Sequence, residues 1–350
     1  MNAATPARAA APGAARTRAL RPRSAAAALA LLASLAVVAL VAAVAVGAAG
    51  IPLREVIAAL TGGADDTTRA IVRDLRLPRA LLAAMTGGAL ALAGAVFQAL
   101  LRNPLAEPYV LGVSGGAAVG AVAAIVLGLA ALSPWIVPLA ALAGALAAIA
   151  IVFRIAAATG RVLDTRVLLL AGVIVGAFFN ALILLLLTFA EAESFRSAVF
   201  WMMGSLSGAS WSAVALLGVY MLPAGVLLLG LARPLNLLAV GEETALHLGV
   251  RVERVKLVAY FVASLLVAAS VAACGVIGFI GLIIPHALRL AWSSDHRFLL
   301  PASLLAGAAF LLVADTAART LAAPAELPVG VITALIGVPV FVVLLARRRV

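Results

Sequence analysis

The chain has 350 residues, of which 65% are hydrophobic and only 11% charged, and its formal net charge is +11. A mean hydropathy of +1.21 excludes an ordinary soluble domain, where roughly a quarter of the residues are charged. Apolar runs long enough to cross a bilayer recur along the chain, without the alternating pattern of membrane strands. The composition therefore predicts an all-α integral membrane protein whose basic residues face lipid headgroups rather than nucleic acid.

Apolar runs separated by charged residues or by Pro and Gly predict about ten transmembrane helices. In chain order they are expected near residues 25–49, 81–101, 109–130, 134–157, 167–190, 211–232, 256–275, 277–291, 299–317 and 329–346. The eighth run is short and contains Gly278, Gly281 and Pro285, so we expect a tilted or broken helix there.

Charge at the two ends predicts the topology. Residues 1–24 contain five arginines and are expected to form a disordered basic tail, and three more arginines stand at 347–349. Ten spans with both termini in the cytoplasm put 18 of the 25 Lys and Arg residues inside, as the positive-inside rule requires. A cleaved signal peptide is the competing interpretation, but the first apolar run of about 25 residues exceeds the usual length of about 7–15.

One predicted cytoplasmic segment is longer and more polar than the others, residues 233–256. It contains two short helical patterns separated by Gly241 and followed by Gly249. The segment is either a solvated connector or a docking surface for a soluble partner. Leu237, Leu238 and Leu246 favour the second interpretation, because amphipathic helices with exposed leucines need something to cover them.

The sequence lacks the residues of the common energy-converting and catalytic sites. A P-loop needs a lysine after its glycine-rich turn, and the single lysine, Lys256, has no such turn before it. Acidic residues buried at mid-membrane depth would indicate ion coupling, and Asp315 is the one doubtful case. One cysteine and three scattered histidines predict no metal site, and no catalytic motif is present. We therefore expect neither an enzyme nor a bound cofactor.

Two local patterns mark the stretch from Arg102 to Gly120. Pro104 and Pro108 predict a tight cytoplasmic turn between the second and third spans, in which Glu107 stays near water. Glycines at four-residue spacing then predict a face where helices pack closely in lipid, and these are Gly112, Gly116 and Gly120.

Five segments in series resemble the FecCD-type permeases of ATP-binding-cassette importers. They are LRLPRALLAAMTGGALALAGAVFQALLRNPLAEPYVLGVSGGAAVGA, WMMGSLSG, LNLLAVGEETALHLGV, GFIGLIIPHALRL with DHRFLLPAS, and ELPVGVITALIGVPVF. The resemblance runs from about residue 50 to the end, with the motifs in family order.

The resemblance implies the fold of a type II importer permease in a bacterial cytoplasmic (inner) membrane, with residues 25–350 as one transmembrane domain. It implies a homodimer, or a pair with a paralogue, above two ATP-binding subunits that use the ATP. It also implies an extracytoplasmic substrate-binding protein that delivers an iron chelate, haem or cobalamin.

Three groups of residues gain expected roles from the resemblance. Segments matching 235–250 couple to the ATPase in the family, which implies that role for Leu237, Leu238, Gly241, Glu242, Glu243 and Gly249. Arginines matching Arg76, Arg79 and Arg319 face acidic residues of the binding protein in a related cobalamin permease, so charge reversal there should weaken docking while the permease stays folded. Asn103 and Leu105 are the implied elements of the cytoplasmic gate.

The residues leave the cargo open among siderophore, haem and cobalamin. Few His, Cys or Met residues lie in the spans, which favours a chelated or organic cargo over bare metal ions, and the frequency of cargoes in the family favours iron chelates. An ion-coupled secondary transporter is the alternative function, followed by a membrane enzyme or scaffold.

Overall fold

The computed structural model describes residues 21–47, 49–158 and 164–346, and in these ranges the regular elements are helices. Seven segments are long and apolar enough to cross a membrane: α1 (Pro22–Ala45), Asp66–Leu100, α6 (Ile136–Ala158), α7 (Thr165–Thr188), α9 (Trp211–Gly230), α12 (Val252–Cys274) and α14 (His296–Thr320). Three shorter apolar helices complete the set: α5 (Val113–Val126), α13 (Ile280–Ala291) and α15 (Val329–Ala346). Each of the ten predicted spans corresponds to one of these helices. The predicted tail lies almost wholly outside the described residues, and α1 already begins at Pro22.

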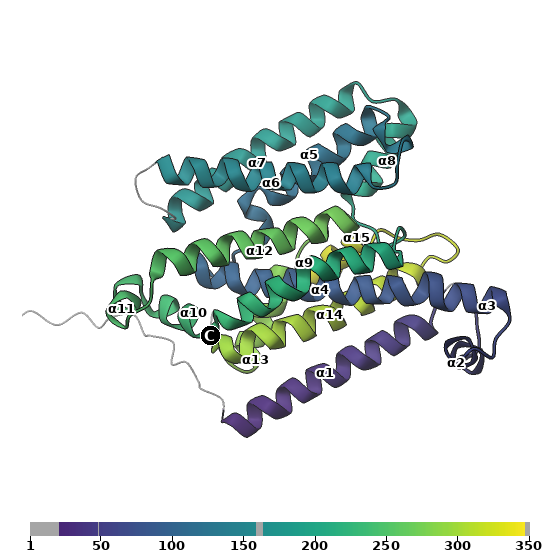
Figure 1. Cartoon of the computed structure of the whole chain (residues 1–350), viewed down its shortest axis with the longest axis horizontal. Helices are drawn as coiled ribbons and strands as arrows, with labels where there is room; N and C mark the ends of the chain where they lie inside the picture. Colours follow the sequence, from purple (N-terminus) through teal and green to yellow (C-terminus); the bar gives the residue numbers. More distant parts are fainter. Residues whose placement is uncertain (1–20, 48, 159–163, 347–350) are drawn as a thin grey trace, which may run out of the picture.

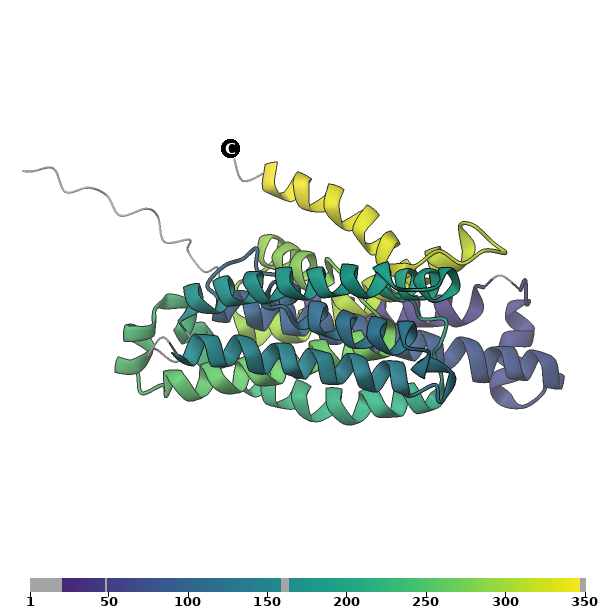
Figure 2. The ribbon, with the colours of Figure 1, turned by 90° about the horizontal axis from the view of Figure 1, so that it is seen from above.

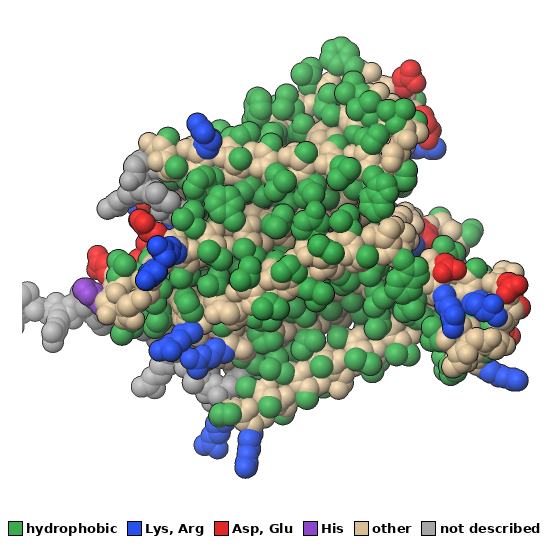
Figure 3. Space-filling view, in the orientation of Figure 1, with side chains coloured by type: hydrophobic (Ala, Val, Ile, Leu, Met, Phe, Trp, Pro, Cys, Tyr) green, Lys and Arg blue, Asp and Glu red, His purple; other side chains and the backbone are tan. Residues whose placement is uncertain are grey.

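The long helices run side by side and alternate in direction (Figure 1). The start of α1 lies at the same end of the bundle as two short helices, α10 (Ala232–Val240) and α11 (Glu242–His247). At the opposite end lie α2 (Leu53–Thr61), α3 (Asp66–Ala70) and α8 (Ala192–Met202). We call the first end inner and the second outer, following the topology expected from the sequence. In Figure 3, hydrophobic side chains cover the middle of the visible face and charged ones gather at both ends.

The helix that contains the second span is much longer than predicted. The helix α3, the π-helix η1 (Ile71–Arg76) and α4 (Leu77–Leu100) form one continuous run of 35 residues. Such a run measures about 52 Å, well beyond the roughly 30 Å of a hydrocarbon core. The hydropathy pattern ends where charged residues begin, but the backbone stays helical beyond that point. Asp65 caps the outer start by accepting a hydrogen bond from Thr68 N at 3.0 Å, and hydrogen bonds from Thr68 lower the pKa of Asp65.

The third and eighth spans are short because an irregular stretch precedes each one. Residues 101–112 connect α4 to α5, and residues 275–279 connect α12 to α13. The second stretch ends at Phe279, whose φ of 71° lies in the left-handed region that few side chains adopt. The predicted break near the eighth span is thus present, and it lies on the N-terminal side of the helix.

Glycines allow α4 to contact its neighbours backbone to backbone. A Cβ atom on Gly87 would overlap the carbonyl oxygen of Gly307 in α14, and one on Gly94 would overlap Gly281 of α13. In lipid, this close packing supplies much of the attraction between helices, because apolar burial adds little there. The helix α4 is accordingly the most buried of the spans. At the edge of the bundle, α15 leaves the other helices at an angle (Figure 2).

Candidate functional site

The turn at the inner end of α4 contains the two predicted gate residues. Arg102 has a φ of 47°, which reverses the chain direction directly after the helix. Asn103 Oδ1 accepts a hydrogen bond from Leu105 N at 3.0 Å, forming a compact Asx-turn, and Leu105 is 40% exposed. Both residues therefore lie on a rigid turn at the inner end, while their role as a gate stays a prediction.

Beyond this turn the chain does not remain at the inner surface. Pro108 lies against Gly281, which in turn faces Leu90 and Gly94 in the middle of α4. Glu107 Oε1 accepts a hydrogen bond from Phe279 N at 2.7 Å, at the start of α13. The expectation that Glu107 stays near water is therefore corrected: the free N–H groups of a helix N-terminus attract the carboxylate.

A tyrosine strengthens the junction between the two irregular stretches. The hydroxyl of Tyr109 donates to Ile277 O at 2.7 Å and accepts from Ile277 N at 3.2 Å. Gln98 Nε2 donates to the carbonyl oxygens of Gly281 and Leu282, both at 3.1 Å. The Tyr109 bonds tie the stretch 101–112 to the residues before α13, and the Gln98 bonds tie α4 to the first turn of α13.

The predicted coupling segment forms two helices, α10 and α11, separated by Gly241 as the sequence indicates. Gly249 ends the second one with a φ of +80°. Leu238 is only 3% exposed and packs inside the chain, which corrects the expectation that it is free to meet a partner. It shares a helix face with the buried Leu235, because residues three apart lie on one side of a helix.

The outward surface of the segment is formed by other residues. Val240 is 73% exposed, Leu246 57% and Leu248 61%. Glu243 is also exposed, whereas Leu237 is half-buried. Val240 and Leu248 were missed from the sequence. Val240 lies five residues after the buried Leu235 in α10, which places it away from the core side of that helix, whereas Leu248 follows the end of α11 and no helical pattern places it.

Glu242 faces the chain's own basic residues. Its Oε1 lies 3.0 Å from Lys256 Nζ and 3.3 Å from the Arg102 guanidinium. Lys256 is 5% exposed, so Glu242 is the counter-charge of a buried ammonium group. A cavity of about 1170 Å³ adjoins these groups and is lined by the coupling segment, the turn at Arg102 and the start of α7. Of the predicted gate and coupling residues, Asn103, Glu242 and Glu243 therefore line the same cavity.

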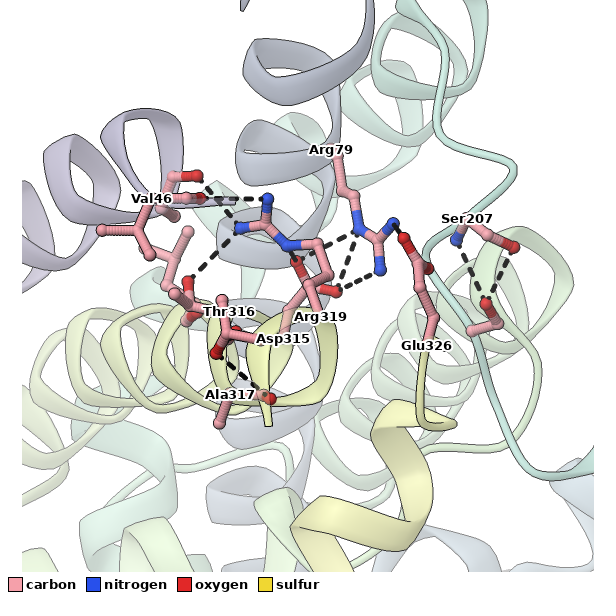
Figure 4. Close-up of polar contacts among 12 residues, drawn as sticks. Val46, Arg79, Ser207, Asp315, Thr316, Ala317, Arg319 and Glu326 are labelled. Carbon is pink, nitrogen blue, oxygen red and sulfur yellow. Dashed lines mark hydrogen bonds and ion pairs between the residues drawn. The ribbon is translucent and has the colours of Figure 1, made fainter. Parts of the chain in front are cut away.

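At the outer end, two of the three predicted docking arginines, Arg79 and Arg319, form an ionic cluster with Asp315 and Glu326 (Figure 4). Arg79 donates to Asp315 Oδ1 at 3.0 Å and to Glu326 Oε2 at 2.9 Å. Arg319 Nε lies 3.0 Å from Asp315 Oδ2. Asp315 is 1% exposed and so holds a buried negative charge between two arginines.

The arginines also bind the end of α1. Arg76 donates to the carbonyl oxygens of Val44 and Ala45, and Arg319 donates to Ala43 O at 3.0 Å. Such bonds satisfy carbonyl groups that a helix C-terminus leaves free. The three arginines nevertheless line a cavity of about 350 Å³, together with the exposed Leu75. Their role in docking stays a prediction. Their contacts within the chain give them a structural role as well.

The predicted packing glycines of α5 fall into two groups. Cβ atoms on Gly116 and Gly120 would overlap the carbonyl oxygens of Gly144 and Ala140 in α6. Gly112 precedes the helix with a φ of +76° and supplies the bend before α5. It also lies close to α7, because a Cβ atom there would be 3.4 Å from the carbonyl oxygen of Gly172.

Comparison with known proteins assigns this architecture. A family model described as the FecCD transport family matches residues 35–347. The chain belongs to the FecCD transport family. One FecCD relative is the cobalamin import permease BtuC of Halobacterium salinarum, which is 46% identical over 84% of this chain and 78% of the relative. Another is the vitamin B12 import permease BtuC of Escherichia coli, which is 46% identical over 79% of this chain and 84% of the relative. The ABC transporter permease YvrB of Bacillus subtilis is 43% identical over 82% of each chain.

Two solved structures resemble this FecCD chain. One is described as the inward-facing conformation of an ABC transporter assigned to the metal-chelate type. That structure has a TM-score of 0.82 and 34% sequence identity, and the match covers 91% of this chain and 98% of the solved chain. The other, PsaBC of Streptococcus pneumoniae in complex with Fab, is 19% identical with a TM-score of 0.53, over 79% and 93% of the two chains, and shows the fold alone. This protein is therefore a multi-pass permease of the ABC importer type.

Proposed function

We propose that this chain forms the translocation pore of an importer for an iron chelate, such as a ferric siderophore or haem, or for cobalamin. A soluble binding protein outside the cell membrane delivers the cargo, and two ATP-binding subunits on the cytoplasmic side hydrolyse ATP. A second copy of the chain, or a paralogue, completes the pore. Cobalamin import by the two BtuC relatives and the metal-chelate type of the similar structure support this cargo class.

The ion pair between Arg102 and Glu242 is the observation that carries the proposal. It joins a helix of the coupling segment to the turn that holds Asn103 and Leu105, at a separation of 3.3 Å. A force applied to α11 from the cytoplasm therefore acts on the inner mouth through a direct contact. A solvated connector would need no such contact.

The exposed residues of the coupling segment support docking of an ATPase. Val240, Leu246 and Leu248 are exposed apolar side chains of this segment, which also carries the exposed carboxylate of Glu243. Apolar side chains at the inner end of a membrane protein lie beyond the lipid tails, so a protein partner is the natural cover for them. Gly241 and Gly249 then shape the loop that presents this surface.

The outer cluster supports docking of an acidic partner. The paired charges of Arg79, Arg319, Asp315 and Glu326 cancel, and Arg76, which lines the same cavity as Leu75, adds a surplus of one positive charge. Acidic groups on a binding protein would be steered toward such a site, more strongly at low ionic strength.

The ion-coupled alternative loses its main candidate residue. A relay carboxylate must gain and lose a proton or a sodium ion during transport. Asp315 instead lies 3.0 Å from each of two arginines, so its two carboxylate oxygens are already engaged in ion pairs within the chain.

Uptake by the purified complex tests the proposed function. The tagged chain is isolated with its partners from its own membrane, reconstituted into vesicles and supplied with binding protein and labelled cyanocobalamin, haemin or a ferric siderophore. We expect accumulation of one of these that requires ATP. Accumulation driven by a proton or sodium gradient without ATP would favour the secondary transporter instead.

A further inference from the structure

The coupling helix α10 is attached to the inner end of α14 by one side chain that the sequence patterns did not identify. Asn236 Nδ2 donates to Asp295 Oδ1 at 2.7 Å. Its Oδ1 accepts from His296 N at 2.8 Å and lies 2.7 Å from His296 Nδ1. Asp295 and His296 form the N-cap and first residue of α14.

Chemistry allows a single orientation of this amide. A carboxylate only accepts hydrogen bonds, so the NH₂ group of Asn236 must face Asp295. Its oxygen then faces the His296 backbone N–H, and the imidazole Nδ1 must carry a proton to donate to the same oxygen. All three bonds depend on both ends of the Asn236 side chain, so an apolar residue of the same size makes none of them.

The surroundings hold these bonds in place. His296 is 4% exposed, and the neighbouring Leu235, Leu238 and Phe298 are buried. Water competes poorly for hydrogen bonds at such a site, and a buried polar group that loses its partner is costly. Rotation of α10 relative to α14 would break all three bonds and disturb the cap of α14, where Asp295 Oδ1 also accepts from Arg297 N at 2.9 Å.

The helix held by this contact reaches the outer cluster. The helix α14 has 25 residues, which corresponds to about 37 Å. Asp315 and Arg319, which bind Arg79 and the end of α1, lie on its last two turns. Between the two ends, α14 touches α4 backbone to backbone at Gly307 and Gly87.

We propose that Asn236 is a positioning residue that makes α10 and α14 move as one body, and thereby links the ATPase surface to the outer arginine cluster. Binding of the extracytoplasmic protein at the outer end then changes the position of α10, and displacement of α10 by the ATPase moves the outer cluster. This inference rests on the proposed function, because it requires a partner at each end of α14.

Substitutions that exchange the roles of donor and acceptor test the link. Asn236→Leu keeps the branched shape of the side chain and removes all three bonds, and Asn236→Asp turns a carboxylate toward Asp295. The double variant N236D/D295N restores a donor and acceptor pair between the two helices in the opposite sense, with the amide NH₂ group of residue 295 in the place of the oxygen that accepts from Arg297 N. Arg297→Gln, at an exposed position in the first turn of α14 and outside the coupling segment, is the matched control.

The readout is ATP hydrolysis by the reconstituted complex with and without the binding protein, together with cargo uptake per ATP. We expect Asn236→Leu and Asn236→Asp to keep basal hydrolysis and to lower stimulation by the binding protein about fivefold. The double variant should recover stimulation, and Arg297→Gln should retain it.

Three results would overturn the inference: normal stimulation in Asn236→Leu, equal loss of basal and stimulated hydrolysis in both single variants, or no recovery in N236D/D295N. Equal loss indicates that Asn236 only supports local folding. The wild-type complex separates the two proposals, because absence of ATP-driven uptake there contradicts the proposed function itself. Normal wild-type uptake with unaffected Asn236 variants contradicts only the link.

Discussion

Arg102 and Glu242 are 140 positions apart in the chain, and the Arg102 guanidinium lies 3.3 Å from the Glu242 carboxylate. Glu242 also neutralises Lys256, which is almost fully buried. One carboxylate thus serves two cations of different exposure. The exposed pair with Arg102 contributes little to stability, and the buried one contributes more.

Alanine substitutions should separate these two contributions. Arg102→Ala removes only the exposed partner and should lower the free energy of unfolding by less than about 1 kcal/mol. Glu242→Ala leaves the Lys256 ammonium group buried without its counter-charge and should cost about 2 kcal/mol. Thermal unfolding midpoints of the purified variants give the ranking, and a lower midpoint for Arg102→Ala than for Glu242→Ala would contradict this assignment. Arg102→Ala should still reduce uptake per ATP, because the contact with the inner mouth is lost.

Asp315→Asn should destabilise the outer cluster. The arginines at 79 and 319 would lose the charge between them while their side chains stay 12% and 7% exposed. We expect a loss of about 3 kcal/mol, because breaking a buried ion pair leaves uncompensated charge. Glu326→Gln is the control: its side chain is 44% exposed, and its loss should cost no more than about 1 kcal/mol. An Asp315→Asn protein as stable as wild type that has lost ion-driven uptake would instead indicate a relay carboxylate.

A negative charge introduced beside Arg76, Arg79 and Arg319 should test docking of the binding protein better than reversing the charge of these arginines. Reversal at Arg76 or Arg319 also removes the bonds to the end of α1, so the expectation that such variants stay folded no longer holds. Leu75→Glu changes a side chain that is 61% exposed on the cavity rim. We expect about tenfold weaker docking of the binding protein at low salt, since like charges then face each other. Leu53→Glu, exposed on α2 and absent from the cavity lining, is the control, and equal docking by both variants would argue against this surface.

Alanine substitutions at a glycine of α5 and at a glycine of α7 should show which of the two is a helix-packing position. A Cβ at Gly120 meets the Ala140 carbonyl oxygen, whereas a Cβ at Gly176 in α7 meets nothing within 4 Å. Gly120→Ala should therefore lower stability by about 2 kcal/mol, because overpacking forces the helices apart. Gly176→Ala should be neutral or slightly stabilising. Comparable losses in both variants would mean that helix packing does not explain the Gly120 result.

Cross-linking should test the inner mouth. Asn103→Cys in two copies, joined by an oxidant or a short bifunctional reagent, should block uptake if the turn lines the gate. Cys274 is buried, so the introduced thiol is the accessible one. Reduction of the disulfide should restore uptake. Undiminished uptake by the cross-linked pair would show that the turn at Asn103 has only a structural role.

Much of the fold follows from hydropathy, because lipid requires each crossing segment to satisfy its own backbone hydrogen bonds. The ten spans and the two helices around Gly241 were therefore predictable. The outer half of the helix Asp66–Leu100 was not predicted, because its charged residues interrupt the apolar pattern from which the spans were predicted. The path of Glu107 toward Phe279 was hidden too, because a local pattern does not tell which distant helix end supplies the N–H group.

The sequence by itself determined that the chain crosses a membrane about ten times, that it lacks a P-loop, and that residues 233–256 form a polar segment with two short helical patterns. Each of these conclusions rests on local composition or on spacing along the chain. The tertiary structure alone decided that Arg102 meets Glu242, that Asp315 lies between two arginines, and that Asn236 holds the start of α14. Ion pairs and hydrogen bonds act over about 3 Å. Their partners are therefore fixed only when helices distant in sequence pack side by side.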